Sequence, residues 1–363
     1  MRFGYGKLKL MKVAISSFPL ESGHKDRGIG SYTRNLIDAL RRYSDVEVIE
    51  FSGSIPSEKV DLVHLTWFDL FFKTLTVSKY PTVVTIHDVI PLKFSDYYPA
   101  GLRGKVNLFW QKQALKKVAK IITVSEISKN DISKYLNIPE EKIRVTFEGI
   151  DDAFKVMSKS QSDKVKNKYD LSDSFLVYVG DANYVKNLPF LIKGFKKIKE
   201  TKATQGMKLV LVGGVFTKVI TGNHPELESL REVHQLIKEF NFENDILMPG
   251  YVNNEDLAGF YNLATLYIQP SLYEGFGLPV LEAMSCGTPV ISSSGGSLPE
   301  IGGKATLYFD PTDQADFISK LTEVLQNSSL RDKLSSQGLV RAKEFSWQKV
   351  ADKTVKAYLE ATS

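Results

Sequence analysis

The sequence has only one cysteine and no long hydrophobic run, and these two features exclude some classes of protein. Because Cys286 has no second cysteine to pair with, an internal disulfide bond is excluded, and we expect a reducing, cytoplasmic compartment. No apolar run approaches the roughly 20 residues of a membrane-spanning helix. The basic segment Met1–Leu10 lacks the apolar stretch of a signal peptide, so the sequence predicts a disordered extension before an alternative start at Met11.

Two further absences exclude classes of function. No paired aspartates occur at metal-ligand spacing, so we expect no required divalent cation and no cofactor. No nucleic-acid recognition module accompanies the lysines, so nucleic acid is not an expected partner. The formal net charge of +5 suits an anionic substrate or an anionic membrane surface without specifying either.

The chain alternates short apolar runs with helical patterns. The runs that predict strands are Lys12–Ser16, Val46–Phe51, Leu62–Leu65, Thr82–Ile86, Ile121–Val124, Ile143–Thr146, Phe175–Val179, Lys208–Val212, Ile246–Met248, Leu266–Gln269, Pro289–Ser292 and Thr306–Phe309. Continuous runs rich in β-branched residues are typical of parallel strands that helices cover on both faces. The polar stretch Lys155–Asp173 interrupts the series, and its start predicts a linker. The sequence therefore predicts two successive α/β units.

The most informative stretch is Pro270–Val290 (PSLYEGFGLPVLEAMSCGTPV), which follows a predicted strand. Gly275 and Gly277 allow the backbone to approach a ligand closely. Pro279 suits the first position of a helix that we expect over Pro279–Cys286, with Gly287 as its cap. Helix N-termini at the carboxyl ends of parallel strands bind phosphates through backbone N–H groups. The pattern predicts a diphosphate site around Leu278.

Two carboxylates flank this predicted site. Glu274 precedes the glycines, and Glu282 lies one turn into the predicted helix. A carboxylate beside a phosphate is electrostatically unfavourable unless it accepts hydrogen bonds from hydroxyl groups, and ribose and hexoses supply such groups. A favourable first-turn glutamate explains Glu282 alone, but it does not explain both acids together with the glycines and the proline. We therefore interpret the stretch as a sugar-nucleotide site.

The pattern Glu274-x7-Glu282 within EGFGLPVLEAMSCGTPV resembles the signature of the retaining glycosyltransferases of family 4, which have the GT-B fold. Weaker similarities to the family's landmarks are Arg27–Tyr32, Val84–Asp88, Ile122–Ser125, Tyr178–Gly180 with Lys186–Asn187, Gly250–Val252 and Ser297–Glu300. The resemblance covers nearly the whole chain. It implies two Rossmann-like domains with parallel sheets facing a central cleft: an acceptor-side domain over residues 1–165 and a donor domain over 166–346, with 347–363 crossing back onto the first.

The resemblance also implies roles for individual residues. Glu282 would bind the donor ribose, Glu274 would bind a hydroxyl of the donor sugar, and Lys186 would neutralise charge on the leaving diphosphate. The catalytic residues it implies are Glu274, His87 and Lys186. The donor-binding residues it implies are Glu282, Gly275, Phe276, Gly277, Leu278, Gly28, Gly30, Gly180 and Val252, of which Val252 would lie near the base.

One position departs from the family pattern. Asp181 follows Gly180 where family members commonly have an arginine, so Lys186 lacks the bidentate partner that an arginine would provide. Three consequences are open: another cation replaces the arginine, backbone amides stabilise more of the charge, or the enzyme is slow. By spacing alone, Lys186 is equally compatible with a solvent-exposed loop lysine.

The first domain offers weaker candidates. Gly28 and Gly30 lack the third glycine of a dinucleotide site. The resemblance implies that they belong to the family's first glycine loop, which would approach the donor diphosphate or the acceptor, and an ordinary glycine-rich turn before a helix is a credible alternative. His87 follows a buried strand, where α/β sheets bind ligands. We favour a ligand-binding role for His87 over simple pairing with Asp88, and a structural role for His64.

The stretch Lys105–Lys120 (KVNLFWQKQALKKVAK) predicts a basic amphipathic helix. Its predicted apolar row is Phe109, Ala114, Val118 and Ile121, with Trp110 beside it. Contact with anionic lipid headgroups is one interpretation. A helix whose apolar row faces the core and whose lysines face solvent is favoured over it.

The predicted function is the retaining transfer of a hexose from a nucleotide-diphosphate sugar to a hydroxyl of a glycan or lipid-linked acceptor. The segment HDVIPL and the pair Tyr97 and Tyr98 resemble bacterial mannosyl- and hexosyltransferases of surface polysaccharide synthesis, which favours GDP-mannose weakly over UDP-sugars. The main alternative is a sugar-nucleotide-binding protein of the same fold with little or no transfer activity. An epimerase or phosphorylase of this fold and an NAD-dependent oxidoreductase are more remote alternatives.

Overall fold

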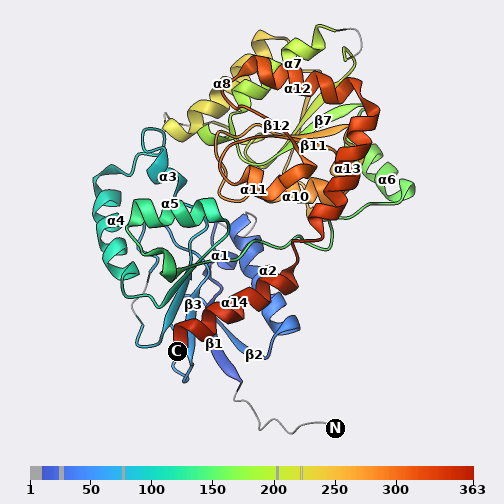
Figure 1. Ribbon diagram of the computed structural model, residues 1–363. Helices are drawn as coiled ribbons and strands as arrows, with labels where there is room; N and C mark the ends of the chain where they lie inside the picture. Colours follow the sequence, from blue (N-terminus) through green and yellow to red (C-terminus); the bar gives the residue numbers. More distant parts are fainter. Residues whose placement is uncertain (1–9, 24–27, 76–77, 202–203, 221, 223) are drawn as a thin grey trace, which may run out of the picture. The chain divides into compact units, whose positions relative to one another are not determined.

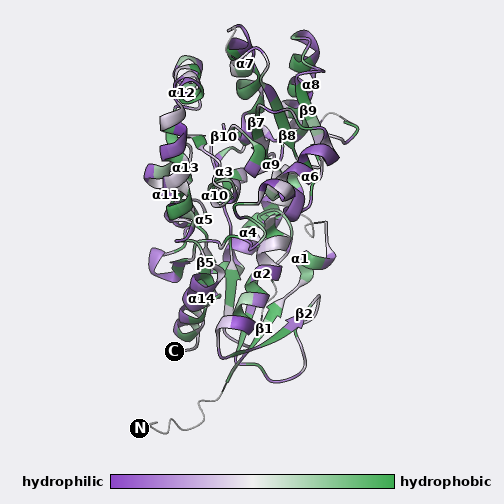
Figure 2. Cartoon of the chain, turned by 90° about the vertical axis from the view of Figure 1, so that its right-hand side faces the viewer, coloured by the Kyte–Doolittle hydropathy of each residue, from purple (hydrophilic) through white to green (hydrophobic). Residues whose placement is uncertain are grey.

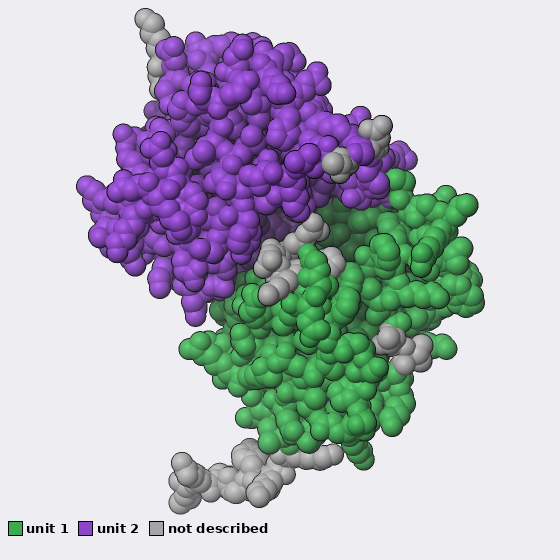
Figure 3. Space-filling model, turned by 180° about the vertical axis from the view of Figure 1, so that it is seen from behind, with its two compact units in different colours: residues 1–95, 99–149, 346–363 green, residues 96–98, 150–345 purple. Residues whose placement is uncertain are grey.

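The computed structural model describes residues 10–23, 28–75, 78–201, 204–220, 222 and 224–363, so the predicted extension before Leu10 and Arg27 of the glycine segment lie outside the described residues. Contacts divide the chain into two units (Figure 3). Unit 1 contains the described residues up to Ser95, Pro99–Gly149 and Ser346–Ser363, and unit 2 contains Asp96–Tyr98 and Ile150–Phe345. The division falls at Gly149, before the expected residue 165. Helix α6 (Lys159–Tyr169) therefore belongs to unit 2, where Val165 packs against Gly259.

Unit 1 is built on a parallel sheet with the strand order β2-β1-β3-β4-β5-β6. Its strands are β1 (Met11–Ser16), β2 (Val46–Phe51), β3 (Leu62–Leu65), β4 (Thr82–Thr85), β5 (Lys120–Thr123) and β6 (Ile143–Val145). Its helices are α1 (Phe18–Glu21), α2 (Gly28–Tyr43), α3 (Ile90–Lys93), α4 (Gly101–Leu115), α5 (Glu126–Leu136) and α14 (Trp347–Thr362). Each predicted strand of this unit lies within one residue of its expected bounds.

Successive residues of the unit 1 strands pack into two different cores. Val13 and Ile15 of β1 pack in a cluster with α2 and α14, whereas Ala14 between them packs in a cluster with α4 and α5. Helices therefore cover both faces of the sheet, as the continuous apolar runs predict (Figure 1). The strand β1 is mainly hydrophobic, with Lys12 as its one charged residue, whereas helices such as α8 carry both hydrophobic and hydrophilic residues (Figure 2).

Unit 2 contains a second parallel sheet, with the strand order β12-β11-β10-β7-β8-β9. Its strands are β7 (Phe175–Val179), β8 (Lys208–Val212), β9 (Ile246–Gly250), β10 (Leu266–Gln269), β11 (Val290–Ser293) and β12 (Leu307–Phe309). The helices besides α6 are α7 (Leu188–Lys199), α8 (Glu228–Glu239), α9 (Asn254–Leu263), α10 (Leu278–Ser285), α11 (Leu298–Gly302), α12 (Gln314–Gln326) and α13 (Ser328–Ala342), with a short 3-10 helix η2 (Tyr184–Lys186) after β7. Residues of α7, α8 and α12 share one core cluster with the sheet.

The strand order of unit 2 reverses beside β7. The chain runs from β7 through β8 to β9 on one side and then returns to place β10 on the other side. The loops that follow β7 and β10 therefore diverge from neighbouring strands at the same edge of the sheet. Such a topological switch point is where open α/β sheets bind ligands.

Two predictions about unit 1 helices are wrong. Gly28 and Gly30 do not form a loop, because α2 begins at Gly28 and Gly30 is buried in its first turn. The helix predicted over Lys105–Lys120 spans Gly101–Leu115, and its predicted apolar row is not one face of it. Phe109 is exposed, whereas Val118 and Ile121 are buried but lie beyond the end of the helix. The core side of α4 is formed by other residues, including two amide side chains that bond to the backbone of a neighbouring loop.

His64 of β3 ties helix α14 to the sheet of unit 1. The fully buried His64 ring contacts the Tyr358 hydroxyl through Nδ1 at 2.7 Å and the Thr85 hydroxyl through Nε2 at 2.9 Å. Burial, with a smaller contribution from His87, lowers the pKa of His64 from 6.5 to about 3. The ring is therefore a neutral structural group, in agreement with the role expected from the sequence.

This histidine makes the stability of the protein sensitive to acid. Its pKa is lower in the folded than in the unfolded chain, so unfolding takes up a proton below pH 6.5. We expect the free energy of unfolding to fall between pH 6.5 and 3 by up to about 1.4 kcal/mol per pH unit from His64 alone. Urea unfolding at several pH values measures the slope, which should be smaller in His64→Gln and unchanged in His224→Gln, at an exposed site. Equal slopes in all three proteins would contradict the assignment.

Candidate functional site

The loop Pro270–Gly277 after β10 leads directly into helix α10. Gly277 has left-handed angles (φ 104°, ψ 42°) immediately before Leu278, the first residue of the helix, and Pro279 follows. The helix ends at Ser285, and Gly287 has a φ of 78°. The predicted helix with its glycine termini is therefore present, with a start one residue earlier than expected. Pro279 has no N–H, and the Val280 N–H donates to the Gly277 carbonyl at 3.0 Å, so the Leu278 N–H is the donor of the first turn that remains at the carboxyl edge of the sheet.

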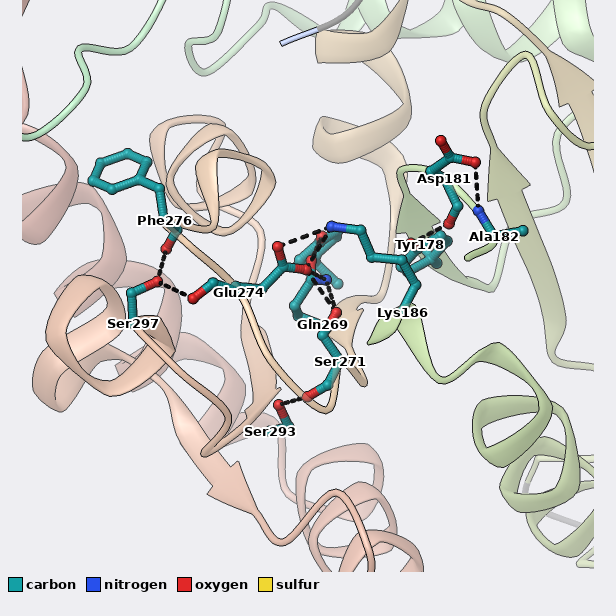
Figure 4. A network of polar contacts seen from close by, with 11 residues as sticks. Tyr178, Asp181, Ala182, Lys186, Gln269, Ser271, Glu274, Phe276, Ser293 and Ser297 are labelled. Atoms are coloured by element: carbon teal, nitrogen blue, oxygen red, sulfur yellow. Dashed lines mark hydrogen bonds and ion pairs between the residues drawn. The ribbon is translucent and has the colours of Figure 1, made fainter. Parts of the chain in front are cut away.

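Glu274 of this loop forms an ion pair with Lys186 (Figure 4). The Nζ atom of Lys186 lies 2.7 and 2.8 Å from the two carboxylate oxygens, and the side chains are only 21% and 10% exposed. Lys186 is thus not the solvent-exposed loop lysine that the spacing allowed. Because Lys186 ends η2 after β7 and Glu274 follows β10, the pair bridges the two loops of the switch point.

Two buried neutral side chains also hold Glu274. Gln269 Nε2 donates to Glu274 Oε1 at 2.9 Å, and Ser271 Oγ donates to the same oxygen at 2.7 Å. Gln269 is oriented in turn by the hydroxyl of Tyr267, which donates to its amide oxygen. Sequence reasoning missed Gln269 and Ser271, although both lie within five residues of Glu274 at the end of a strand.

A second loop braces the backbone around Glu274. Ser297 donates to the Glu274 carbonyl through its N–H and its hydroxyl, both at 3.1 Å, and its hydroxyl also lies 2.7 Å from the Phe276 carbonyl. A Cβ atom on Gly296, whose φ is 63°, would lie 2.4 Å from the Glu274 carbonyl oxygen. A Cβ atom on Gly295 would lie equally close to the carbonyl oxygen of Leu272. The adjacent glycines after β11 are the feature of the sequence from which this close approach could have been predicted.

Glu282 lies on α10 and is 9% exposed. The hydroxyl of Tyr261 on α9 donates to Glu282 Oε2 at 2.9 Å. Burial, followed by the negative charge of Glu282, raises the pKa of Tyr261 well above its ordinary value, so the tyrosine remains a hydrogen-bond donor. The two motif carboxylates therefore have different partners: a cation for Glu274 and a neutral hydroxyl for Glu282.

Gly180 and Asp181 form a tight turn after β7. Gly180 has a φ of 152°, and a Cβ atom there would lie 2.7 Å from the hydroxyl oxygen of Tyr178. That hydroxyl donates to the Asp181 carbonyl at 2.7 Å, and the Asp181 carboxylate accepts from the Ala182 N–H at 2.8 Å. The aspartate at the unusual position therefore stabilises the local turn. Val252 follows β9 and is buried.

The remaining predicted site residues lie in unit 1. His87 Nδ1 lies 3.5 Å from an oxygen of Glu148, and both side chains are largely buried. The ring of Tyr32 packs edge-on against the imidazole, with centroids 4.7 Å apart. Among the described residues His87 Nε2 has no hydrogen-bond partner although it is buried. Glu148, which sequence reasoning missed because it is 61 residues away along the chain, therefore pairs with one nitrogen of a ring whose second nitrogen is buried and unpaired among the described residues.

Two kinds of feature were not found in the described part of the chain. Within it, no three His, Cys, Asp or Glu side chains are grouped so that they could hold a metal ion. None of the helices described is both long enough and apolar enough to cross a bilayer.

Two family patterns match the sequence. The pattern of the family described as "Glycosyl transferases group 1" matches residues 159–341, about half of the chain. That of "Glycosyltransferase Family 4" matches residues 49–154. The first match contains every predicted site residue of unit 2, and the second contains His87 and Glu148.

Similar proteins include mannosyltransferases. The O-antigen chain mannosyltransferase B of Escherichia coli is 31% identical over 280 residues, which are 76% of this chain and 69% of that protein. The serotype-specific mannosyltransferase WbdA of Escherichia coli is 25% identical over 308 residues, which are 82% of this chain and 36% of that protein. The chain thus spans little more than a third of the length of the second relative.

The fold is also similar to that of a solved structure with bound ligands. The HepE protein of Anabaena, in complex with UDP and glucose, superposes with a TM-score of 0.74 at 17% identity. The match covers 95% of this chain and 98% of that one. At this identity the similarity establishes the fold alone.

The bracing glycine offers a test of how the loop is held. We expect Gly296→Ala to destabilise unit 2 by about 3 kcal/mol, because the new Cβ combines left-handed strain with overpacking against the Glu274 backbone. Gly206→Ala is the matched control, since a Cβ there meets nothing within 4 Å, and it should change stability by less than about 0.5 kcal/mol. Calorimetric unfolding measures both. Similar effects of the two substitutions would show that the close approach is not required.

Proposed function

Because the chain belongs to the glycosyl transferases group 1 and has the GT-B fold, we propose that it transfers a hexose from a nucleotide-diphosphate sugar to a hydroxyl of a glycan or lipid-linked acceptor. Mannose is the proposed sugar, since the similar Escherichia coli proteins are mannosyltransferases. GDP-mannose is the first candidate donor. A UDP-sugar is the second, because the HepE protein of the same fold holds UDP and glucose.

The observation that carries the proposal is the Lys186–Glu274 ion pair at the switch point of unit 2. Without a donor, each charge compensates the other. A donor brings diphosphate oxygens for the ammonium group and sugar hydroxyls for the carboxylate, so both charges keep partners when the donor binds. The Leu278 N–H at the start of α10 is a further donor for the diphosphate. The site therefore suits a ligand that carries phosphate and hydroxyl groups side by side.

Glu282 is proposed to bind the ribose of the donor. Tyr261 fixes one oxygen of its carboxylate, so the acid is oriented before the ligand arrives. Because the carboxylate is already oriented, ribose hydroxyls can donate to it with little rearrangement of the site. Gly180, with its adjacent turn, and Val252 lie at the ends of β7 and β9, and we assign them to contacts with the diphosphate and the base.

We propose that transfer proceeds with retention of the anomeric configuration and without a metal ion. The site motif contains no evident side-chain nucleophile, so the acceptor hydroxyl attacks on the face from which the diphosphate leaves, and a departing phosphate oxygen takes its proton. Lys186 and the Leu278 N–H stabilise the charge that develops on the leaving group. His87, oriented by Glu148, is assigned to hydrogen bonding with the donor sugar.

A second candidate function is sugar-nucleotide binding with little or no transfer. Asp181 favours it, because the position that commonly supplies an arginine to the diphosphate instead carries a carboxylate that stabilises its own turn. Binding of donor without turnover in the experiments below would support this alternative.

Nucleotide binding is tested by thermal unfolding with UDP, GDP, ADP and their sugar conjugates. A ligand at 100 times its Kd should stabilise the protein by about 2.7 kcal/mol. We expect a shift with one base only, and a much smaller shift in Glu282→Ala because the ribose contact is lost. Glu243→Ala, at an exposed site of unit 2, is the matched control and should keep the full shift. The absence of a shift with every nucleotide would contradict a donor site.

Turnover is tested with two lysines of unit 2 that form ion pairs of nearly equal length. Lys186 pairs with Glu274 in the site, and Lys193 pairs with Glu232 at the surface at 2.8 Å. We expect Lys186→Met to lower kcat by about 100-fold or more, as for loss of one donor to a developing charge, and Lys193→Met to leave kcat within about twofold. Initial rates of sugar transfer in EDTA measure the effect. An unchanged kcat in Lys186→Met, or activity that requires added Mg2+, would contradict the mechanism.

A further inference from the structure

Helix α4 of unit 1 exposes several large apolar residues and buries two polar ones, while Leu108 and Leu115 pack in the core. Leu102 is 86% exposed, and Val106, Phe109 and Trp110 are 56–57% exposed. These residues recur every three or four positions and therefore lie on one side of the helix. The opposite side is buried and contains Gly104, Asn107, Gln111 and Leu115.

Hydrogen bonds fix the helix in this rotation. Asn107 Nδ2 donates to the Phe71 carbonyl at 2.8 Å, and Gln111 Nε2 donates to the carbonyls of Asp69 and Phe72 at 2.8 and 2.7 Å. Turning the apolar side inward would leave these buried groups unpaired, at a cost of about 1–3 kcal/mol each. The same loop presents Phe72, which is 69% exposed, beside the helix. We call Phe72, Leu102, Val106, Phe109 and Trp110 the apolar patch.

Positive charge surrounds the apolar patch. The basic residues of α4 and the two positions after it are Arg103, Lys105, Lys112, Lys116 and Lys117. From Tyr97 to Ser125 the sequence contains no aspartate or glutamate. Within the described part of the chain none of these five cations forms an ion pair. This segment is therefore both apolar and cationic.

We propose that the apolar patch and its basic surround dock on an anionic lipid surface. Phe109 and Trp110 would enter the headgroup region, where aromatic rings are favoured, and the lysines would contact lipid phosphates. A protein partner fits less well, because it would need a matching acidic surface for the cations that flank the patch, whereas an anionic lipid surface offers negative charge over its whole extent. The proposal does not depend on transfer activity, although it agrees with a lipid-linked acceptor.

Vesicle flotation at low ionic strength tests the docking surface. The unaltered protein should bind vesicles of phosphatidylcholine with phosphatidylglycerol at least about tenfold more tightly than vesicles of phosphatidylcholine alone. Phe109→Ser with Trp110→Ser should weaken binding to the anionic vesicles by about tenfold or more, since two large apolar side chains no longer enter the lipid. Lys116→Gln with Lys117→Gln should weaken it by about tenfold as well and reduce its salt dependence.

Matched controls use exposed residues outside unit 1. Val219→Ser with Val340→Ser removes two valines that are 85% and 66% exposed, and Lys159→Gln with Lys164→Gln removes two exposed lysines of α6. Both controls should bind vesicles as the unaltered protein does. Equal binding by all variants, or no binding to anionic vesicles, would overturn the proposal. So would loss of a dimer in the Phe109 and Trp110 variant without vesicle binding, since a second copy would then be the occupant.

The nucleotide shift separates this proposal from the donor site. Variants of the apolar patch should keep the full thermal shift with nucleotide, because the patch shares no residue with the loops of unit 2. Vesicle binding without any nucleotide shift would remove the donor site and leave the docking surface intact. A nucleotide shift without vesicle binding would support the donor site and contradict the docking surface.

Discussion

The buried ion pair between Lys186 and Glu274 is the interaction on which the candidate site depends. Its two members follow β7 and β10, neighbouring strands from which the chain leaves in opposite directions. A partly buried carboxylate is costly without a partner, so the cation and the neutral donors Gln269 and Ser271 must all be in place. The pair therefore fixes the relative position of two loops that the sheet alone would leave adjacent but independent.

Glycine makes this arrangement sterically accessible. Gly296 brings one loop against the backbone of Glu274, and Gly180 allows the turn that leads toward Lys186. A side chain at either position would meet atoms within 2.7 Å, so the loops could not reach the same separation. Close backbone contact and charge pairing act together: the first sets the path of each loop, and the second sets which side chains meet.

Much of the fold could be predicted from the sequence, because most strands are short apolar runs and such a run indicates burial directly. The helix after Gly277 was predictable for a similar reason, since glycine and proline mark its ends within a few residues. The partners of the site were not predictable in the same way. Glu148 reaches His87, and Ser297 reaches Glu274, across distances along the chain that no local pattern encodes. The prediction for the orientation of α4 was wrong, because the periodicity of a helix shows that it has an apolar side but not that this side faces the core. The amides of Asn107 and Gln111 instead bond to a neighbouring loop and hold the opposite side against unit 1.

The two glutamates of the motif are eight positions apart, and that spacing gives them different surroundings. Glu274 lies in the loop and is paired with a cation, so any ligand that draws Lys186 toward itself must also supply hydrogen bonds to the carboxylate. Glu282 lies on the helix and is paired with the neutral Tyr261, so a ligand can add a hydrogen bond there without separating charges. Contacts at Glu282 therefore contribute to binding of the ligand alone. A rearrangement at Glu274, in contrast, also changes which group pairs with the positive charge of Lys186. In the proposed reaction that charge follows the departing diphosphate, which makes Glu274 the residue through which binding of the sugar and stabilisation of the leaving group are linked.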